Sequence, residues 1–403
     1  MLKLATRNVL RHKARTGMTL AAIVFGVVGL IFSGGFVQDV YHQLGEAIIH
    51  SQSGHLQVSR AGFHATGTRS PERYLIDDPQ SLEKTLLKQP GVAEVMARIS
   101  FSGLLSNGRT DWPIIGEGVE PAKEAALGSQ LNITSGRQLL PDDVHGILLG
   151  HGVAHALKLG PGDQVTLLVN TPEGALNSQE FDVIGTFQSF SSDFDARAVR
   201  IPLATAQDLL GTPGANTLVL ALQHTEATED VAATLKKQLD STRFEVKTWI
   251  ELNDFYESTV ALYQRQFGVL QLIILILVLL SVANSVNMSA FERVGEFGTM
   301  MALGSRSNHV FRLLAVENAL LGTAGGLLGV AFGIVLALAV SAIGIPMPPP
   351  PNANIGYIAH IRIVPSVILM AFLVGFSATV LAALLPAWRV SRVAVVDALR
   401  QNC

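Results

Sequence analysis

The segment Glu292–His309, with the sequence ERVGEFGTMMALGSRSNH, mixes carboxylates, arginines and glycines with apolar side chains between two long apolar stretches. Glu292 and Glu296 are four residues apart and would share one face of a helix. Another face would carry apolar side chains: Phe291, Val294, Phe297 and Met301. This pattern supplies neither a nucleophile nor a metal-ligand set. Gly298 and Gly304 would allow close approach of another element and a sharp exit from the helix.

The sequence contains no recognisable catalytic or cofactor motif. It lacks G-x-x-x-x-G-K-[ST], so it is not predicted to hydrolyse ATP through a P-loop, and it lacks G-x-S-x-G and H-E-x-x-H. His151 and His155 would share a helix face and suit a metal, but no third ligand is evident and surface histidines are favoured. Two acidic pairs lie among turn residues and favour solvated loops: Asp142 and Asp143, and Asp193 and Asp195. We therefore predict no catalytic, cofactor-binding or metal residue, and no enzyme.

Four apolar stretches are long enough to cross a membrane, which takes about 20 residues of helix. The sequence is 49% hydrophobic and 15% charged, with a mean hydropathy of +0.38, which argues against a soluble globule. Three windows contain no Asp, Glu, Lys or Arg: 16–38, 266–291 and 363–388. A fourth, 313–343, contains a single acid. The fold class predicted is a membrane protein with four transmembrane helices.

That single acid is Glu317, close to the start of its window. An acid facing lipid at mid-membrane costs about 2.5–3.5 kcal/mol, so we expect Glu317 at the membrane interface, paired with a cytoplasmic base. The alternative is a buried proton or substrate site.

Basic residues set the predicted orientation. Residues 1–15, the loop 292–312 and the tail 389–403 contain five, three and three Lys or Arg, whereas the Pro-rich loop 344–362 contains one. Both termini are therefore expected in the cytoplasm, and the first span is expected to remain as an uncleaved anchor. Residues 39–265 lie outside, with 28 acidic and 17 basic residues and no cysteine, which favours neither a nucleic-acid surface nor a disulfide.

The external region 39–265 is predicted to be an α+β domain inserted between helices 1 and 2 on a two-helix stalk. Strands are expected at 54–60, 114–119, 164–169, 181–187, 217–223 and 244–249. Helices are expected at 78–92, ending in a turn, at 202–210, and at 225–240 with a threonine cap. Residues of about 120–200 carry more turn signals and indicate a mostly β insert. The stalk would use 39–50 and 250–265, which continue the neighbouring spans. The Pro-rich loop would be a stiff connector or a rigid outer rim.

Glycines in the spans occur at helix-packing distances. Three pairs in the third span have the G-x-x-x-G spacing: Gly322 and Gly326, Gly325 and Gly329, and Gly329 and Gly333. The first span has a parallel set in which Gly26 and Gly29 take part, together with Ala22 and Ser33. Such strips let another helix approach closely, either within one subunit or across a dimer.

Three blocks resemble the FtsX-like permease family, the membrane subunits of MacB-type (type VII) ABC systems, which include the lipoprotein-releasing permeases. LATRNVLRHKARTGMTL (Leu4–Leu20) is similar to the family's basic entry helix before span one. Residues Glu292–Gly329 follow its E-R-x-x-E-[IF]-G…A-L-G…E…G-x-x-G-x-x-x-G pattern. LPAWRVSRVAVVDALR (Leu385–Arg400) is similar to its ending. The family often has a second arginine where this chain has Gly295.

The resemblance implies mechanotransmission. Two copies of a separate ATPase, which binds ATP and Mg, would pair with two permease subunits, as a homo- or heterodimer, and move the external domain. That domain would resemble a Porter lobe split around a Sabre lobe. The segment Glu292–Ser305 would be the coupling helix. The residues assigned to it are Phe291, Glu292, Arg293, Val294, Glu296, Phe297, Gly298, Met301, Ala302, Leu303 and Gly304.

The branch within the family decides the cargo. Phe181–Leu210 resembles the lipoprotein-releasing permeases, although the matching connection Asn170–Gln179 is too short for the hook with which they recruit a carrier. The resemblance implies a bacterial inner membrane protein with a periplasmic domain that extracts or exports a lipoprotein or other amphipathic cargo. A periplasmic carrier or adaptor and membrane lipids would be further partners. The alternatives are a small-molecule or peptide efflux permease, and a regulator of signalling or cell-wall hydrolases that moves no substrate.

Overall fold

The computed structural model describes residues 2–11, 13–67, 71–127, 131–189, 191–349 and 356–391. The chain folds into two compact units. The helical unit comprises Met1–His42, Thr259–Pro346 and Ile358–Cys403, and the sheet unit comprises Gln43–Ser258 and Met347–Tyr357. The predicted cytoplasmic tail from 392 and residues 350–355 of the Pro-rich loop lie outside the described residues. The flanks of that loop form two short paired strands, β11 (Ile345–Met347) and β12 (Tyr357–Ala359).

Among the described residues, four helices are long and apolar enough to cross a membrane, as the sequence predicts. They belong to α2 (Lys13–Ile48), α10 (Asp254–Glu292), α12 (Ser307–Ile343) and α13 (Pro365–Val390), and two further helices are α1 (Leu2–Arg11) and α11 (Val294–Ala302). Helices α2, α10 and α12 extend beyond their apolar windows because no helix breaker separates those windows from the polar residues beside them. Gly344, at φ 70°, ends α12, and Pro365 begins α13.

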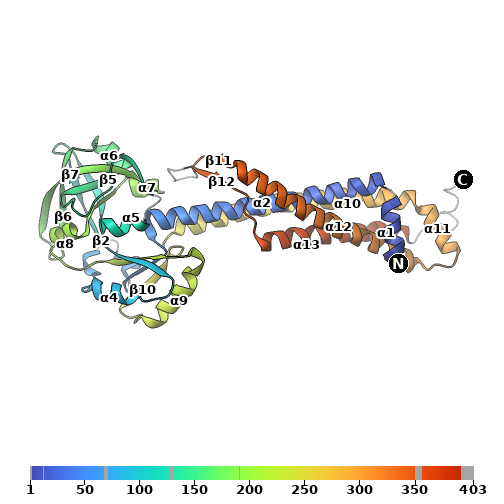
Figure 1. Cartoon of the computed structure of the whole chain (residues 1–403), viewed down its shortest axis with the longest axis horizontal. Coiled ribbons are helices and arrows are strands. Elements are labelled where there is room, and N and C mark those ends of the chain that lie inside the picture. The colour runs from blue at the N-terminus through green and yellow to red at the C-terminus, as the bar shows by residue number, and fades with distance from the viewer. Residues whose placement is uncertain are drawn as a thin grey trace. The chain divides into compact units, whose positions relative to one another are not determined.

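Small and β-branched residues form the core of the helical unit. Side chains of α2, α10 and α13 meet in it, among them Ile23, Val27, Val278, Val282 and Ala378. Figure 1 shows these helices side by side with α12. Large apolar side chains also remain exposed on α10 and α12, which suits helices surrounded by lipid.

The glycine strips pack inside this chain, which is one of the two arrangements that their spacing allows. A Cβ at Gly325, Gly329 or Gly333 of α12 would meet side chains of α2, 2.8–2.9 Å away at the nearest atom. Gly322 and Gly326 lie against α13 instead. On α2, Gly26 and Gly29 contact Val278 and Ile274 of α10. The glycines therefore let α12 pack against α2 and α13, and α2 against α10.

The described residues of the sheet unit contribute ten strands to one sheet. Their order is β10-β1-β9-β2-β3-β8-β5-β7-β4, and β6 pairs with β2 and β7. The strands are β1 (Leu56–Arg60), β2 (Val92–Ser106), β3 (Asp111–Val119), β4 (Asn132–Gly136), β5 (Gly146–Gly150), β6 (Gln164–Asn170), β7 (Leu176–Gln188), β8 (Ala198–Pro202), β9 (Thr217–Leu222) and β10 (Phe244–Thr248). The helices are α3 (Phe63–Thr66), α4 (Pro79–Leu86), α5 (Pro121–Leu127), α6 (His151–Leu157), α7 (Ser192–Asp195), α8 (Leu203–Leu210) and α9 (Thr228–Gln238).

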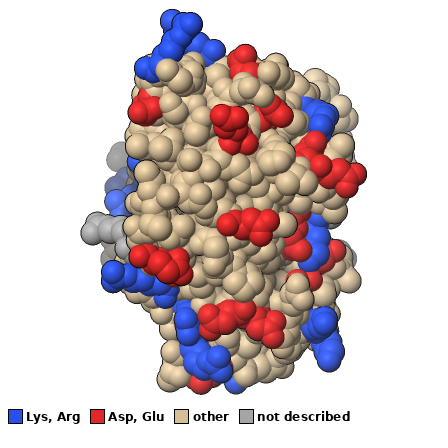
Figure 2. Space-filling model, turned by 90° about the vertical axis from the view of Figure 1, so that its left-hand side faces the viewer, with Lys and Arg blue, Asp and Glu red and all other residues tan. Residues whose placement is uncertain are grey.

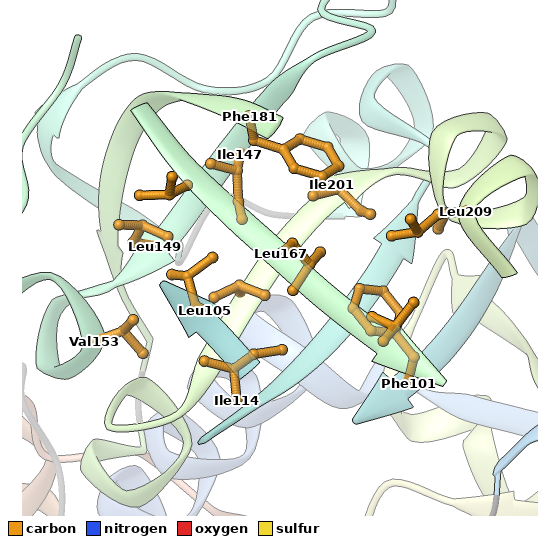
Figure 3. Close-up of a cluster of buried hydrophobic side chains, with 14 of the residues drawn as sticks. Phe101, Leu105, Ile114, Ile147, Leu149, Val153, Leu167, Phe181, Ile201 and Leu209 are labelled. Carbon is orange, nitrogen blue, oxygen red and sulfur yellow. The ribbon is translucent and has the colours of Figure 1, made fainter. Parts of the chain in front are cut away.

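Strand β2 joins two hydrophobic cores. Its first half pairs with β9 as far as Arg98, and its second half pairs with β3 from Ile99 and with β6 from Gly103. One core gathers residues of β1, β9, α4 and α9. The other contains Phe101, Leu105, Ile114, Leu167 and Phe181 among its members (Figure 3). We call the half of the unit built on this second core the β-rich half. Strands β5, β6, β7 and β8, from the predicted insert at about 120–200, contribute to its core, whereas Leu127 of α5 packs with Met96 and Val219.

The sequence misses β2, β4, β5 and β8, and it misplaces one helix cap. Thr225 does not cap α9, because a 3-10 turn Thr225–Ala227 comes first and α9 begins at Thr228 without a side-chain cap. By contrast, Asp78 caps α4 by accepting a hydrogen bond of 3.0 Å from the Ser81 amide.

Figure 2 shows carboxylates scattered over one face, with Lys and Arg mostly near its edges.

A buried neutral histidine makes the stability of the sheet unit depend on pH. Desolvation, followed by repulsion from His50, lowers the pKa of His55 to about 4. Its Nδ1 accepts a 3.2 Å hydrogen bond from the Leu222 amide. Between pH 6.5 and about 4, His55 binds a proton in the unfolded chain but stays neutral in the folded chain. The free energy of unfolding therefore falls as the pH falls below 6.5. We expect thermal melts from pH 7 to 5 to show a larger fall in Tm for the wild type than for His55→Gln, whereas equal falls would contradict the assignment.

Candidate functional site: the junction of α10, α11 and α12

The predicted coupling segment is split by a break at Arg293. Glu292 is the last residue of α10, Arg293 is non-helical at φ −105° and ψ 10°, and α11 begins at Val294. The predicted helix over 292–305 is therefore shorter, ending at Ala302, and α12 already begins at Ser307. Gly304 has φ 95° and provides the predicted sharp exit.

The break exists where Arg293 turns into the protein. Its side chain is buried and forms two hydrogen bonds with Glu317, from Nη1 to Oε2 at 2.7 Å and from Nη2 to Oε1 at 3.3 Å. Its Nε donates to Oε2 of Glu296 at 3.1 Å, and its guanidinium lies 5.0 Å from the ring centre of Phe297. Burial alone would lower the pKa of Arg293, but the bonds to Glu317 and Glu296 raise it above its ordinary value. The side chain therefore stays charged.

Helix α1 takes part in the same network. The Asn8 amide donates a 2.7 Å hydrogen bond to Oε1 of Glu317, and Arg11 lies 3.8 Å from Oε1 of Glu296. The prediction that Glu317 pairs with a base is confirmed, and the base is Arg293. The sequence does not predict that Asn8 and Arg11 contact the acids of the junction. The only feature that points to them is the basic entry helix in which they lie.

A small polar cavity of about 40 Å³ lies beside this network. Its lining includes hydroxyl, amide and charged groups from four helices and the break: Asn8, Thr16, Thr19, Ser285, Ser289, Arg293, Glu317 and Asn318. Thr19 and Ser285 are hydrogen-bonded across α2 and α10. The volume and the density of polar partners suit one or a few water molecules. The junction is thus a polar joint between helices that are otherwise apolar.

The apolar stripe of the segment mostly faces inward, contrary to the predicted docking surface, and Phe291 is its exposed member. Val294 is 4% and Phe297 1% exposed, and they pack with residues of α12 and α13: Val310, Leu314 and Ala387. Gly298 and Arg293 are also buried, and Met301 packs partly against this cluster. The reason is that α12 and α13 already cover the apolar face of this short amphipathic helix.

The remaining assigned residues form an outer face. Phe291 and Leu303 are 66% and 84% exposed. The other exposed residues of the segment are Glu292, Glu296, Thr299, Ala302 and Gly304. We call these seven residues the outer face of the junction. It combines two large apolar side chains with two acids, and its chemistry is that of a protein-binding surface.

The described part of the sheet unit contains no cluster of side chains suited to bind a metal ion. His151 and His155 are exposed on α6, and no group of three His, Cys, Asp or Glu among the described residues is placed to hold a metal ion.

Comparisons with known proteins cover nearly the whole chain. The family model of the MacB-like periplasmic core domain matches residues 16–238, and that of the FtsX-like permease C-terminal region matches 268–395. The lipoprotein-releasing system transmembrane protein LolC of Xylella fastidiosa is 25% identical and covers 97% of this chain and 96% of its own length. The macrolide export ATP-binding/permease protein MacB of Rhodospirillum rubrum is 27% identical over 99% of this chain and 60% of its own. The crystal structure of the periplasmic region of MacB from Actinobacillus actinomycetemcomitans covers 53% of this chain at 18% identity and a TM-score of 0.38.

Proposed function

Because this chain belongs to the FtsX-like permeases with a MacB-like periplasmic core domain, we propose that it is the membrane subunit of an ABC transporter that couples ATP hydrolysis by a separate ATPase to movement of its periplasmic domain. It would work in a bacterial inner membrane, with both termini in the cytoplasm. ATP and Mg would be bound by two ATPase copies, which pair with this chain and a second permease subunit.

The outer face of the junction is the observation that carries this proposal. A segment that transmits movement from a partner to transmembrane helices needs an exposed binding surface and a rigid attachment to those helices. The binding surface consists of Phe291, Leu303 and the two acids. The attachment consists of the Arg293–Glu317 pair and the buried Phe297. The apolar side chains would fill a groove of the ATPase, and the acids would pair with its basic side chains.

The cargo we propose is a lipoprotein or another amphipathic molecule. LolC relatives match this chain over nearly its full length, and their names describe lipoprotein release. The relative MacB supports a second candidate, export of a small amphipathic molecule. Cargo that co-purifies with the complex in mild detergent and leaves on addition of ATP would distinguish the two by its mass, and would speak against a regulator that moves no substrate.

Reversing the charge of both acids is expected to uncouple the chain from its ATPase. Glu292→Lys with Glu296→Lys should weaken ATPase binding at least about tenfold, because a like-charge contact across an interface costs several kcal/mol. The measurement is the amount of Walker-motif ATPase that co-purifies with the full chain and the stimulation of its ATP hydrolysis. The control Glu226→Lys with Glu229→Lys changes the same charge on exposed positions of the sheet unit. Unchanged binding in the first variant would refute the docking role, and a wild type that brings down no ATPase would refute the proposed function.

A further inference from the structure

The end of α2 belongs to the sheet unit and is held there by buried arginines. After Ile48 the helix continues as a π-helix, Ile49–Ser53. The carbonyl oxygens of Ser51 and Gln52, at the end of this segment, accept hydrogen bonds from Arg200 Nη2 at 3.4 Å and from Arg98 Nη1. Carbonyls at a helix end have no partner within the helix, and cations are favoured there. The two guanidinium groups therefore cap this helix end.

Carboxylates fix the two arginines in place. Arg98 makes a bidentate pair with Glu124 of α5, through Nε at 2.5 Å and Nη2 at 2.8 Å. Arg200 Nε donates to Glu117 at 3.0 Å, and its Nη1 lies 3.9 Å from Glu124. All four side chains are largely buried. Burial alone would raise the pKa of Glu124, but Arg98 and Arg200 lower it below its ordinary value, so the carboxylate stays ionised.

The arginines come from strands that build the β-rich half. Arg98 lies on β2, one residue before that strand leaves β9 and joins β3. Arg200 lies on β8 directly opposite Glu117 of β3 in the parallel ladder. Helix α5 adds a further contact, because the Leu127 carbonyl lies 2.9 Å from Nδ1 of His50. The end of α2 is thus attached to β2, β8 and α5 together.

The bidentate pair with Glu124 fixes the Arg98 guanidinium in direction as well as in distance, unlike an apolar contact that can slide. Each of the two guanidinium groups then gives one hydrogen bond to the helix end. A pull or rotation of the π-helical end must carry the guanidinium groups with it, and through them the strands. Gly54 follows at φ 64°, a conformation that favours glycine, and a Cβ there would meet Val219.

We propose that Arg98, Arg200 and Glu124 form a clamp through which the β-rich half follows movements of the end of α2. This inference rests on the proposed function for the source of the movement, and it assigns positioning roles to residues of the sheet unit.

The test uses a variant that removes the bidentate pair of the clamp and leaves Arg200 paired with Glu117. Arg98→Met alone would strand Glu124 beside a single partner and risk unfolding, whereas Arg98→Met with Glu124→Leu keeps the volume apolar and packed. We expect this double variant of the full chain to fold and to bind its ATPase like the wild type. Backbone amides of residues 49–53 should exchange with deuterium at least about tenfold faster, because the helix end opens more often. ATP-driven release of cargo should fall about tenfold while ATP hydrolysis continues.

The control Arg137→Met removes an exposed bidentate pair with Asp143 and should leave exchange at 49–53 and cargo release unchanged. Wild-type exchange at 49–53 in the double variant would overturn the clamp. Faster exchange with full cargo release would overturn its role in transmission. If the wild type binds no ATPase, the proposed function fails and the transmission role with it, while the exchange rates still decide whether the arginines hold the helix end.

Discussion

Replacing Arg293 with alanine is expected to destabilise the helical unit by about 3–5 kcal/mol, because Glu317 would remain buried without its charge partner. Glu317 is 5% exposed, and Arg293 supplies two of its hydrogen bonds while Asn8 supplies a third. The same change removes the cation from the ring of Phe297 and the bond to Glu296. We expect both a lower unfolding temperature in detergent and a loss of ATPase stimulation.

Two further variants separate charge from geometry. Arg293→Lys keeps the charge but cannot bond both oxygens of Glu317 and contact Glu296 at once, so an intermediate effect is expected. Arg293→Met with Glu317→Leu removes the buried charges together and should regain much of the lost stability without regaining coupling. Arg312→Ala, at an exposed position, is the control. A stability loss for Arg293→Ala no greater than for Arg312→Ala would contradict the network.

The membrane helices could be predicted because their signal is local. An apolar window longer than the hydrocarbon core is rare outside a membrane span, and four such windows correspond to four helices. Glu317 is similarly informative, since a lone acid in such a window needs a partner. Which residue is the partner of Glu317 depends on the break after Glu292, because that break turns Arg293 back toward α12. The sequence gives no signal for the break.

The inward direction of Val294 and Phe297 shows the limit of periodicity. A stripe of apolar residues establishes that one face of a helix is covered, but it does not say whether the chain itself or a partner covers it. Here α12 and α13 do so through Val310 and Ala387. The partner face is instead defined by what stays exposed, Phe291 and Leu303 at the two ends of the segment.

The strands β2 and β8 escape prediction for a related reason. Arg98 and Arg200 are buried charges, which interrupt the apolar pattern that marks a buried strand. Their burial is explained only by Glu124, Glu117 and the end of α2, which lie far away in the sequence. A local sequence pattern cannot reveal charge pairs between residues that lie far apart in the chain. In the sheet unit these pairs lie where the arginines contact the end of α2.

A side chain at Gly329 is expected to separate α12 from α2 and to cost about 1–3 kcal/mol or more through overpacking. A Cβ there would lie 2.8 Å from Cβ and 3.0 Å from Cγ1 of Val27, and 3.3 Å from the Cα of Val24. Because one of these atoms is backbone, rotation of a side chain cannot relieve the clash, and Gly329→Leu should lower the unfolding temperature and the yield of folded protein in detergent.

Gly268→Leu is the matched control, since a Cβ at Gly268 of α10 would meet nothing within 4 Å. Val27→Ala should partly rescue Gly329→Leu by freeing the space that the new side chain fills, because the two positions share one contact. Equal stability of the two glycine variants would show that α2 and α12 do not pack through this strip. A fall in dimer content without loss of monomer stability would place the strip at an interface between subunits instead. If the strip packs inside the chain, Gly329→Leu should instead lower the stability of the monomer before it lowers the dimer content.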